Sequence, residues 1–244
     1  PAVAGAFYPG EAKALGALVE ELVRDGETRP EPWPAVLVPH AGLRYSGRIA
    51  AAVYRRVVIP DVVVILGPKH SRSGMEWAVA PHEAWAVPGA TVSADLSLAR
   101  QLATTIPDLH LDARAHEREH CIEVQLPLLA RLAPHARVVG ILMGGGTLDR
   151  CRQFAGGLAE VLRRQAERPL LVISSDLNHY ASDSENRRLD ALAISALEAL
   201  DPAAVHETVV QRKIGMCGML PAVIVLETLK ELGMLHRCER VEYA

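Results

Sequence analysis

The sequence has no strong excess of either charge and no apolar run long enough to cross a bilayer. Its 26 lysine and arginine residues oppose 29 aspartate and glutamate residues, a net charge of −3 with histidine neutral. This balance excludes a generic basic nucleic-acid binder. Apolar runs such as residues 62–66 are far shorter than the roughly 20 residues of a membrane-spanning helix. No basic stretch followed by an apolar one opens the chain, so we expect no signal peptide and no membrane partner.

Cysteine is scarce, and several common catalytic signatures are missing. The chain has four cysteines in 244 residues and no C-x-x-C pair. A disulfide framework is typical of smaller secreted domains, so we expect reduced thiols and a cytoplasmic protein. Residues 174–175 lack the G-x-S-x-G elbow, and residues 144–146 lack the spacing of a nucleotide-binding loop.

The composition is that of a chain that builds a core, since 50% of its residues are hydrophobic and 23% are charged. Strand-like segments alternate with helix-like ones, and no linker or repeat divides them. We therefore expect an α/β fold, a single domain over residues 1–244 with a mainly parallel central sheet flanked by helices. The expected strands span residues 35–38, 62–66, 137–142 and 170–173. The expected helices span residues 46–57 (capped by Ser46), 93–104 or 95–104 (opened by Ser93 or Asp95), 118–132 (with a kink or a boundary at Pro127), 148–166, 186–200, 203–211 and 219–232.

Three of the expected strands end within a few residues of a histidine, namely His40, His70 and His179. Ligands of open α/β sheets bind outside the carboxyl ends of the strands. If these strands are parallel neighbours, the three imidazoles and Asp176 converge on one pocket. Imidazole is the commonest biological metal ligand, and two imidazoles with one anionic group leave positions open for substrate or water. The sequence therefore predicts a metal site.

The residue patterns leave the anionic ligand open among Asp176, Glu119, Glu123 and Cys217. Cys217 lies just before an expected helix, whose N-terminal amides would stabilise a thiolate. A lone cysteine at such a place is more often a small buried apolar residue. Glu119 and Glu123 share a face at helical spacing, which indicates either a solvated charged turn or support of the pocket.

Six blocks of sequence, in this order, resemble the Memo family, whose microbial members are often called AmmeMemoRadiSam system protein B. The blocks are residues 4–9, 38–42, 66–70, 119–127, 174–179 and 217–218. The family is similar in fold to the LigB-type class III extradiol dioxygenases. The resemblance therefore implies an α/β sheet with a non-haem iron pocket at one edge.

The same resemblance implies a role for individual residues. His40 and His70 match the two histidine ligands of the dioxygenase iron, and Cys217 stands where those enzymes have a carboxylate ligand. His179 matches their acid/base histidine, and Asp176 lies beside it. Three more residues resemble pocket lining: Glu119, His120 and Glu123.

The resemblance implies Fe(II) as the cofactor. A thiolate in place of a carboxylate shifts metal preference toward Cu(I) or zinc, so copper and zinc are the alternatives. Three functions stay open. The first is a metal-dependent, dioxygenase-like oxidoreductase acting on a small molecule. The second is a non-catalytic module that binds a peptide or phosphopeptide, and the third is a metal store or chaperone. The family name further implies a radical-SAM protein and an AMMECR1-like protein as pathway partners.

Overall fold

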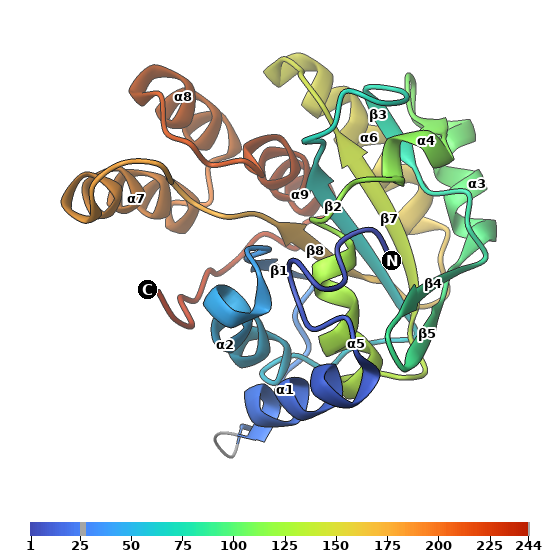
Figure 1. Ribbon diagram of the computed structural model, residues 1–244. Helices are drawn as coiled ribbons and strands as arrows, with labels where there is room; N and C mark the ends of the chain where they lie inside the picture. The colour runs from blue at the N-terminus through green and yellow to red at the C-terminus, as the bar shows by residue number, and fades with distance from the viewer. Residues whose placement is uncertain (25–27, 244) are drawn as a thin grey trace.

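A six-stranded sheet in the order β1-β8-β2-β7-β3-β6 forms the centre of the computed structural model, which describes residues 1–24 and 28–243 (Figure 1). Strands β1, β8, β2 and β7 are parallel, and β3 pairs with β7 in the antiparallel sense. The expected α/β fold, one domain with a mainly parallel sheet between helices, is confirmed. The strands of this sheet are β1 (Ala35–Val38), β2 (Val62–Pro68), β3 (Trp77–Val79), β6 (His110–Leu111), β7 (Arg137–Met143) and β8 (Leu170–Ser174).

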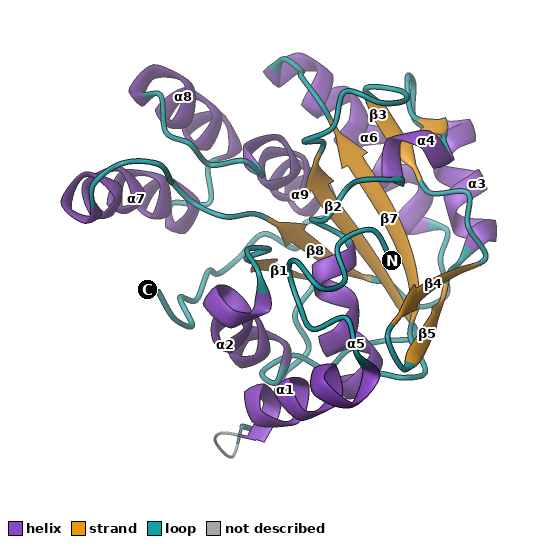
Figure 2. Cartoon of the chain, in the orientation of Figure 1, coloured by secondary structure: helices purple, strands orange, loops and turns teal. Residues whose placement is uncertain are grey.

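Burial on both faces explains the continuous apolar run of β2. Because successive side chains of a strand point to opposite faces, Val64 and Leu66 pack into one hydrophobic cluster, whereas Val63 and Ile65 pack into another. Each fully buried aliphatic side chain contributes about 1.5–3 kcal/mol, so the two clusters hold the strand firmly. Helices α3 (Leu96–Thr105), α6 (Leu148–Arg163) and α9 (Met219–Glu231) contribute to the first cluster, and α1 (Ala12–Arg24), α2 (Leu43–Tyr54) and α5 (Leu126–Leu132) to the second (Figure 2).

The remaining elements also contribute buried side chains to the two clusters. The hairpin of β4 (Ala84–Val87) and β5 (Ala90–Ser93) is a separate two-stranded sheet. The others are α4 (Ala113–His116), the 3₁₀ turn η1 (Glu123–Gln125), α7 (Asp183–Glu198) and α8 (Pro202–Arg212). In the described part of the chain, no helix has the length and apolar character needed to span a membrane.

Three expected helices begin at other residues in the structure, and one of them, expected from residue 186, begins at Asp183 after the N-cap Ser182. The helix expected from Ser46 begins at Leu43, and the Ser46 hydroxyl donates to the carbonyl of Ala41 at 2.9 Å instead of capping the N-terminus. The helix expected over residues 118–132 was wrong in its first part, which is irregular, whereas α5 begins at Leu126 with Pro127 in its first turn, so Pro127 marks a boundary as one of the two expectations had it. Tertiary hydrogen bonds of Glu119 and neighbouring amides, described below, hold that first part. Helix α1 was not expected from the sequence.

The parallel register places the candidate residues at one edge of the sheet. Val38 of β1 pairs with Ser174 of β8, and Leu66 of β2 pairs with Ile173 of β8. The carboxyl ends of these three neighbouring strands therefore lie together, and the segments that carry His40, His70 and Asp176 all leave the sheet at this edge.

Candidate metal centre

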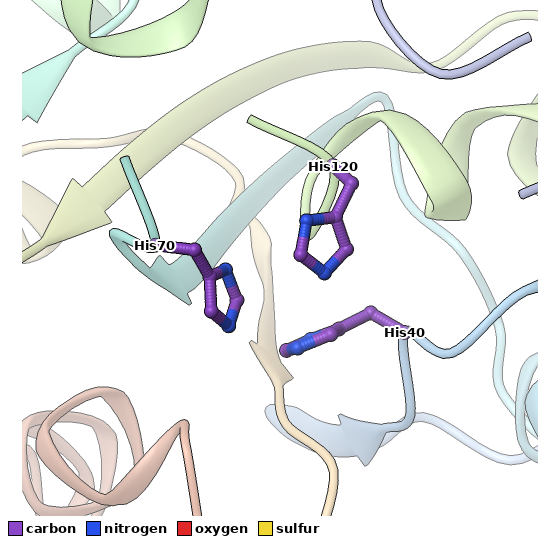
Figure 3. A group of neighbouring side chains, drawn as sticks. All are labelled: His40, His70 and His120. Carbon is purple, nitrogen blue, oxygen red and sulfur yellow. The ribbon is translucent and has the colours of Figure 1, made fainter. Parts of the chain in front are cut away.

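Three histidine rings meet at the carboxyl edge of the sheet (Figure 3). One ring nitrogen from each of His40, His70 and His120 lies within 4.8 Å of the other two. His40 follows β1, His70 follows β2, and His120 belongs to the irregular segment before η1. His40 is buried, with 1% of its surface exposed, whereas the side chain of His70 is 37% exposed. The cluster therefore has a closed side and an open side.

Cys217 brings a sulfur atom to two of these rings. Its Sγ lies 3.2 Å from Nε2 of His40 and also forms a hydrogen bond with His70. The backbone amide of Asp176 donates to the same sulfur at 3.3 Å. Burial raises the thiol pKa, but the hydrogen bonds with the two imidazoles outweigh burial and lower the pKa of Cys217 to about 6. At neutral pH the group is therefore a thiolate, the form of cysteine that binds metals.

The backbone at the start of α9 explains this position of Cys217. Gly218 is the N-cap of α9, and its amide donates to the Ser175 hydroxyl at 2.9 Å. A Cβ at residue 218 would collide with the Ser175 side chain, so only glycine allows this close approach of α9 to β8. The expectation that Cys217 lies just before a helix is confirmed.

Glu119 is the buried carboxylate that orients His70. It accepts hydrogen bonds from Nδ1 of His70 at 2.8 Å, from the His70 amide at 2.6 Å and from the His120 amide at 2.9 Å. Burial opposes its charge, but the hydrogen bonds from His70 outweigh burial and lower the pKa of Glu119 to about 2. A carboxylate only accepts, so Nδ1 of His70 carries the proton, and Nε2 is the atom that remains for a ligand.

The charge of His70 follows from the same contacts. Burial lowers its pKa, but hydrogen bonds with Cys217 and Glu119 outweigh burial and raise the pKa of His70 to about 9. At neutral pH the site therefore combines an imidazolium with two anions. A metal ion that binds Nε2 of His70 has to displace a proton from it.

His120 lies in a stack of three rings. Its ring centroid is 4.4 Å from that of His70 on one side and 4.4 Å from that of Phe7 on the other, with interplanar angles of 27° and 31°. Burial and the neighbouring charge of His70 lower the pKa of His120 to about 4. The rings of His70 and His120 are thus nearly parallel, whereas the rings of His40 and His70 meet edge to face at 79°.

The other candidate residues occupy different places around this cluster. Oδ1 of Asp176 accepts from the amides of His40 at 2.8 Å and Ala41 at 3.2 Å, so it fixes the turn that carries His40. His179 is exposed, and its Nδ1 lies 2.8 Å from the carbonyl oxygen of Leu177. Asp176, Ala41 and His179 also line a cavity of about 750 Å³ beside β1.

Glu123 points away from the histidines and anchors the N-terminal segment. Its carboxylate accepts from the amide of Ala2 at 2.6 Å, the amide of Val3 at 3.0 Å and the Tyr8 hydroxyl. Glu119 and Glu123 therefore do not share a face as helical spacing had predicted. Two further polar residues, Ser174 and Gln125, adjoin His40 and were not expected, because single buried polar residues leave no spacing signal in a sequence.

The fold and the cluster together define a class, an α/β protein with a His/His/Cys cluster at the carboxyl edge of its sheet. A family sequence model described as "Memo-like protein" matches residues 1–244. Curated proteins named as MEMO1 family proteins are similar over almost the whole chain. The one from Aquifex aeolicus is 40% identical over 235 residues, which cover 96% of this chain and 86% of the relative.

Two archaeal relatives agree with this match. The MEMO1 family protein of Aeropyrum pernix is 34% identical over 251 residues, 97% of this chain and 89% of its own length. That of Methanopyrus kandleri is 32% identical over 246 residues, 96% and 87% of the two chains. The chain belongs to the Memo family.

Proposed function

We propose that this protein is a metal-dependent, dioxygenase-like oxidoreductase that holds Fe(II) with His40, His70 and Cys217. The observation that carries the proposal is the 3.2 Å approach of Cys217 Sγ to Nε2 of His40, between residues 177 positions apart in sequence. Two imidazole nitrogens and one thiolate fit a transition metal and leave open positions for a substrate. Fe(II) bound there would supply the redox chemistry for a reaction with O₂, and the soft thiolate makes copper and zinc alternatives.

The protein groups around these ligands prepare them for a metal. The thiol of Cys217, with a pKa of about 6, needs no deprotonation at neutral pH. Glu119 keeps the proton of His70 on Nδ1, so the proton that leaves on metal binding comes from Nε2. Because His70 has a pKa of about 9, metal affinity is expected to rise between pH 6 and pH 9.

His179 is the proposed acid/base residue, and Asp176 is the proposed residue that positions His40. The carbonyl oxygen of Leu177 only accepts, so the hydrogen bond at 2.8 Å places the proton of His179 on Nδ1. Its Nε2 is then free to take a proton from a hydroxyl of a small substrate. Asp176 keeps His40 in place through the backbone amides it binds.

The proposal is tested by loading the protein with Fe(II) without oxygen and then measuring O₂ uptake with catechols and aminophenols. We expect about one iron per chain and substrate-dependent O₂ uptake, both lost in Cys217→Ser. Cys151→Ser is the matched control, because Cys151 is buried in α6, outside the cluster. A wild-type protein that binds no metal would refute the proposal, and a loaded protein that consumes no O₂ with these substrates would refute the oxidoreductase activity.

A metal store or chaperone is the second candidate, and the thiolate of Cys217 favours it. Soft thiolate ligands select Cu(I) over harder cations. This function predicts tight Cu(I) binding that depends on Cys217, together with transfer of the ion to a stronger chelator and no substrate turnover. O₂ uptake in the experiment above distinguishes the two candidates.

A further inference from the structure

A buried chain of hydrogen bonds lies behind His40. The hydroxyl of Tyr54 donates to Oε1 of Gln125 at 3.0 Å, and Nε2 of Gln125 donates to the carbonyl oxygen of Pro39 at 3.0 Å and to Oγ of Ser174 at 3.0 Å. Because the carbonyl of Pro39 only accepts, the amide of Gln125 has to turn its nitrogen toward it. Gln125 and Ser174 have no exposed surface, and Tyr54 has 1%, so water does not compete for these groups.

The hydroxyl of Ser174 has no hydrogen left for His40. A serine hydroxyl offers one donated hydrogen and two lone pairs. The hydrogen goes to the carbonyl oxygen of Cys121 at 2.6 Å, which only accepts. One lone pair receives the amide hydrogen of Gln125. The other faces Nδ1 of His40 at 2.9 Å, so Nδ1 has to be the donor in this contact.

We propose that Ser174, held in place by Gln125, is a positioning residue that keeps a hydrogen on Nδ1 of His40 and so leaves Nε2 as its metal-binding atom. The consequence for metal binding rests on the proposed function, whereas the position of the hydrogen is a property of the metal-free protein. His40 and His70 then follow the same rule with different partners, a hydroxyl for one and a carboxylate for the other.

Loss of the Ser174 hydroxyl is expected to reverse this arrangement. In the wild type, Nε2 of His40 donates to the thiolate of Cys217 at 3.2 Å, and a metal ion that displaces this hydrogen leaves the ring with its other hydrogen on Nδ1, bonded to Ser174. Without an acceptor at Nδ1, the hydrogen on Nε2 is the one that the ring retains, and it blocks the atom that the metal needs. Changes to groups that orient metal-binding imidazoles typically weaken metal affinity about 10- to 100-fold, and we expect this range for Ser174→Ala.

The test combines two measurements on the full chain. Long-range ¹H–¹⁵N correlation spectra of metal-free protein with labelled histidine, recorded at about pH 8, report which ring nitrogen of His40 carries hydrogen. Zn(II) titration against a competing chelator gives the metal affinity. The variants are Ser174→Ala and Gln125→Leu. The matched control is Thr228→Val, which removes another fully buried hydroxyl, bonded to the Ile224 carbonyl at 2.7 Å within α9.

We expect a protonated Nδ1 on His40 in the wild type and in Thr228→Val, and a population with bare Nδ1 in Ser174→Ala, accompanied by the loss of Zn(II) affinity. Gln125→Leu should show a smaller change in the His40 spectrum and in Zn(II) affinity. It replaces Ser174→Ala as the test variant if Ser174→Ala does not fold. An Nδ1 without hydrogen in the wild type, or unchanged spectra in both variants, would overturn the inference but would not contradict the proposed metal site. A wild type with protonated Nδ1 that binds no Zn(II), Fe(II) or Cu(I) would refute the proposed function instead.

Discussion

Substitution of Glu119 by glutamine tests the electrostatic organisation of the site. The carboxylate has a side-chain exposure of 1% and lies 2.8 Å from Nδ1 of His70. Its pKa falls from 4.5 to about 2 in the folded protein, which corresponds to about 3 kcal/mol of stability at neutral pH. The raised pKa of His70 reflects its hydrogen bonds with both Cys217 and Glu119, so it includes the same ion pair and is not added to this free energy.

The sign of the pH dependence follows from the lowered pKa. Above about pH 4.5 the carboxylate is ionised in both folded and unfolded chains, and its full contribution is present. As the pH falls from 4.5 toward 2, the unfolded chain takes up a proton before the folded one, so the contribution is lost. Urea unfolding should therefore show Glu119→Gln less stable than the wild type by about 3 kcal/mol at pH 7 and by about half of this at pH 3.

A second readout separates this ion pair from general destabilisation. The pKa of His70, followed by NMR, should fall from about 9 in Glu119→Gln. Glu123→Gln is the matched control, because Glu123 is also buried but binds the N-terminal segment, and it should leave His70 unchanged. Equal stability of Glu119→Gln and wild type at pH 7, or a stability difference that does not narrow at pH 3, would refute the reasoning.

Three further predictions follow from other residues. In metal-free protein, iodoacetamide should modify Cys217 with a midpoint near pH 6, whereas Cys151, whose pKa burial raises to about 11, should react only after unfolding. Burial and the charge of a neighbouring histidine lower the pKa of His116 from 6.5 to about 4. As the pH falls from 6.5 to 4, the unfolded chain therefore binds a proton at His116 that the folded chain does not, and the fold loses stability. His116→Gln should reduce the fall in Tm over that range. Gly67→Ala should lower the free energy of unfolding by about 1–3 kcal/mol, because its Cβ would collide with Sγ of Cys121.

Each of these three predictions has a result that would contradict it. An alkylation midpoint above pH 8 for Cys217 would mean that the imidazoles do not stabilise its thiolate. A Tm that falls equally with pH in wild type and His116→Gln would exclude His116 as a source of acid sensitivity. A Gly67→Ala protein as stable as the wild type in urea would show that β2 and Cys121 can move apart without a loss of unfolding free energy.

The sheet and the placement of candidate residues at one of its edges were predictable, because both follow from local sequence patterns. The apolar run of β2 reflects burial on two faces. Parallel strands put His40, His70 and Asp176 at one edge, whatever the exact bounds of the strands. Asp95 caps α3 by accepting from the Leu98 amide at 2.9 Å, which selects one of the two starts, Ser93 and Asp95, that the sequence offered.

The detailed surroundings of the histidines were not predictable, because tertiary contacts determine them. Helical spacing suggested that Glu119 and Glu123 act together, but the chain around them is irregular, and each carboxylate binds amides from a different segment. The stacking of His120 depends on Phe7, which is distant in sequence. Ser174 contacts His40, and Gln125 contacts Ser174; no periodic pattern in a sequence encodes such a chain of hydrogen bonds.

X-ray absorption spectroscopy at the zinc edge tests the central claim most directly, since it identifies the atoms around a bound ion. For Zn(II)-loaded protein we predict one sulfur at about 2.3 Å together with imidazole nitrogens at about 2.0–2.1 Å. The sulfur signal should disappear in Cys217→Ser and persist in Cys151→Ser. A wild-type spectrum without sulfur, or one whose sulfur survives in Cys217→Ser, would contradict a metal centre built from His40, His70 and Cys217.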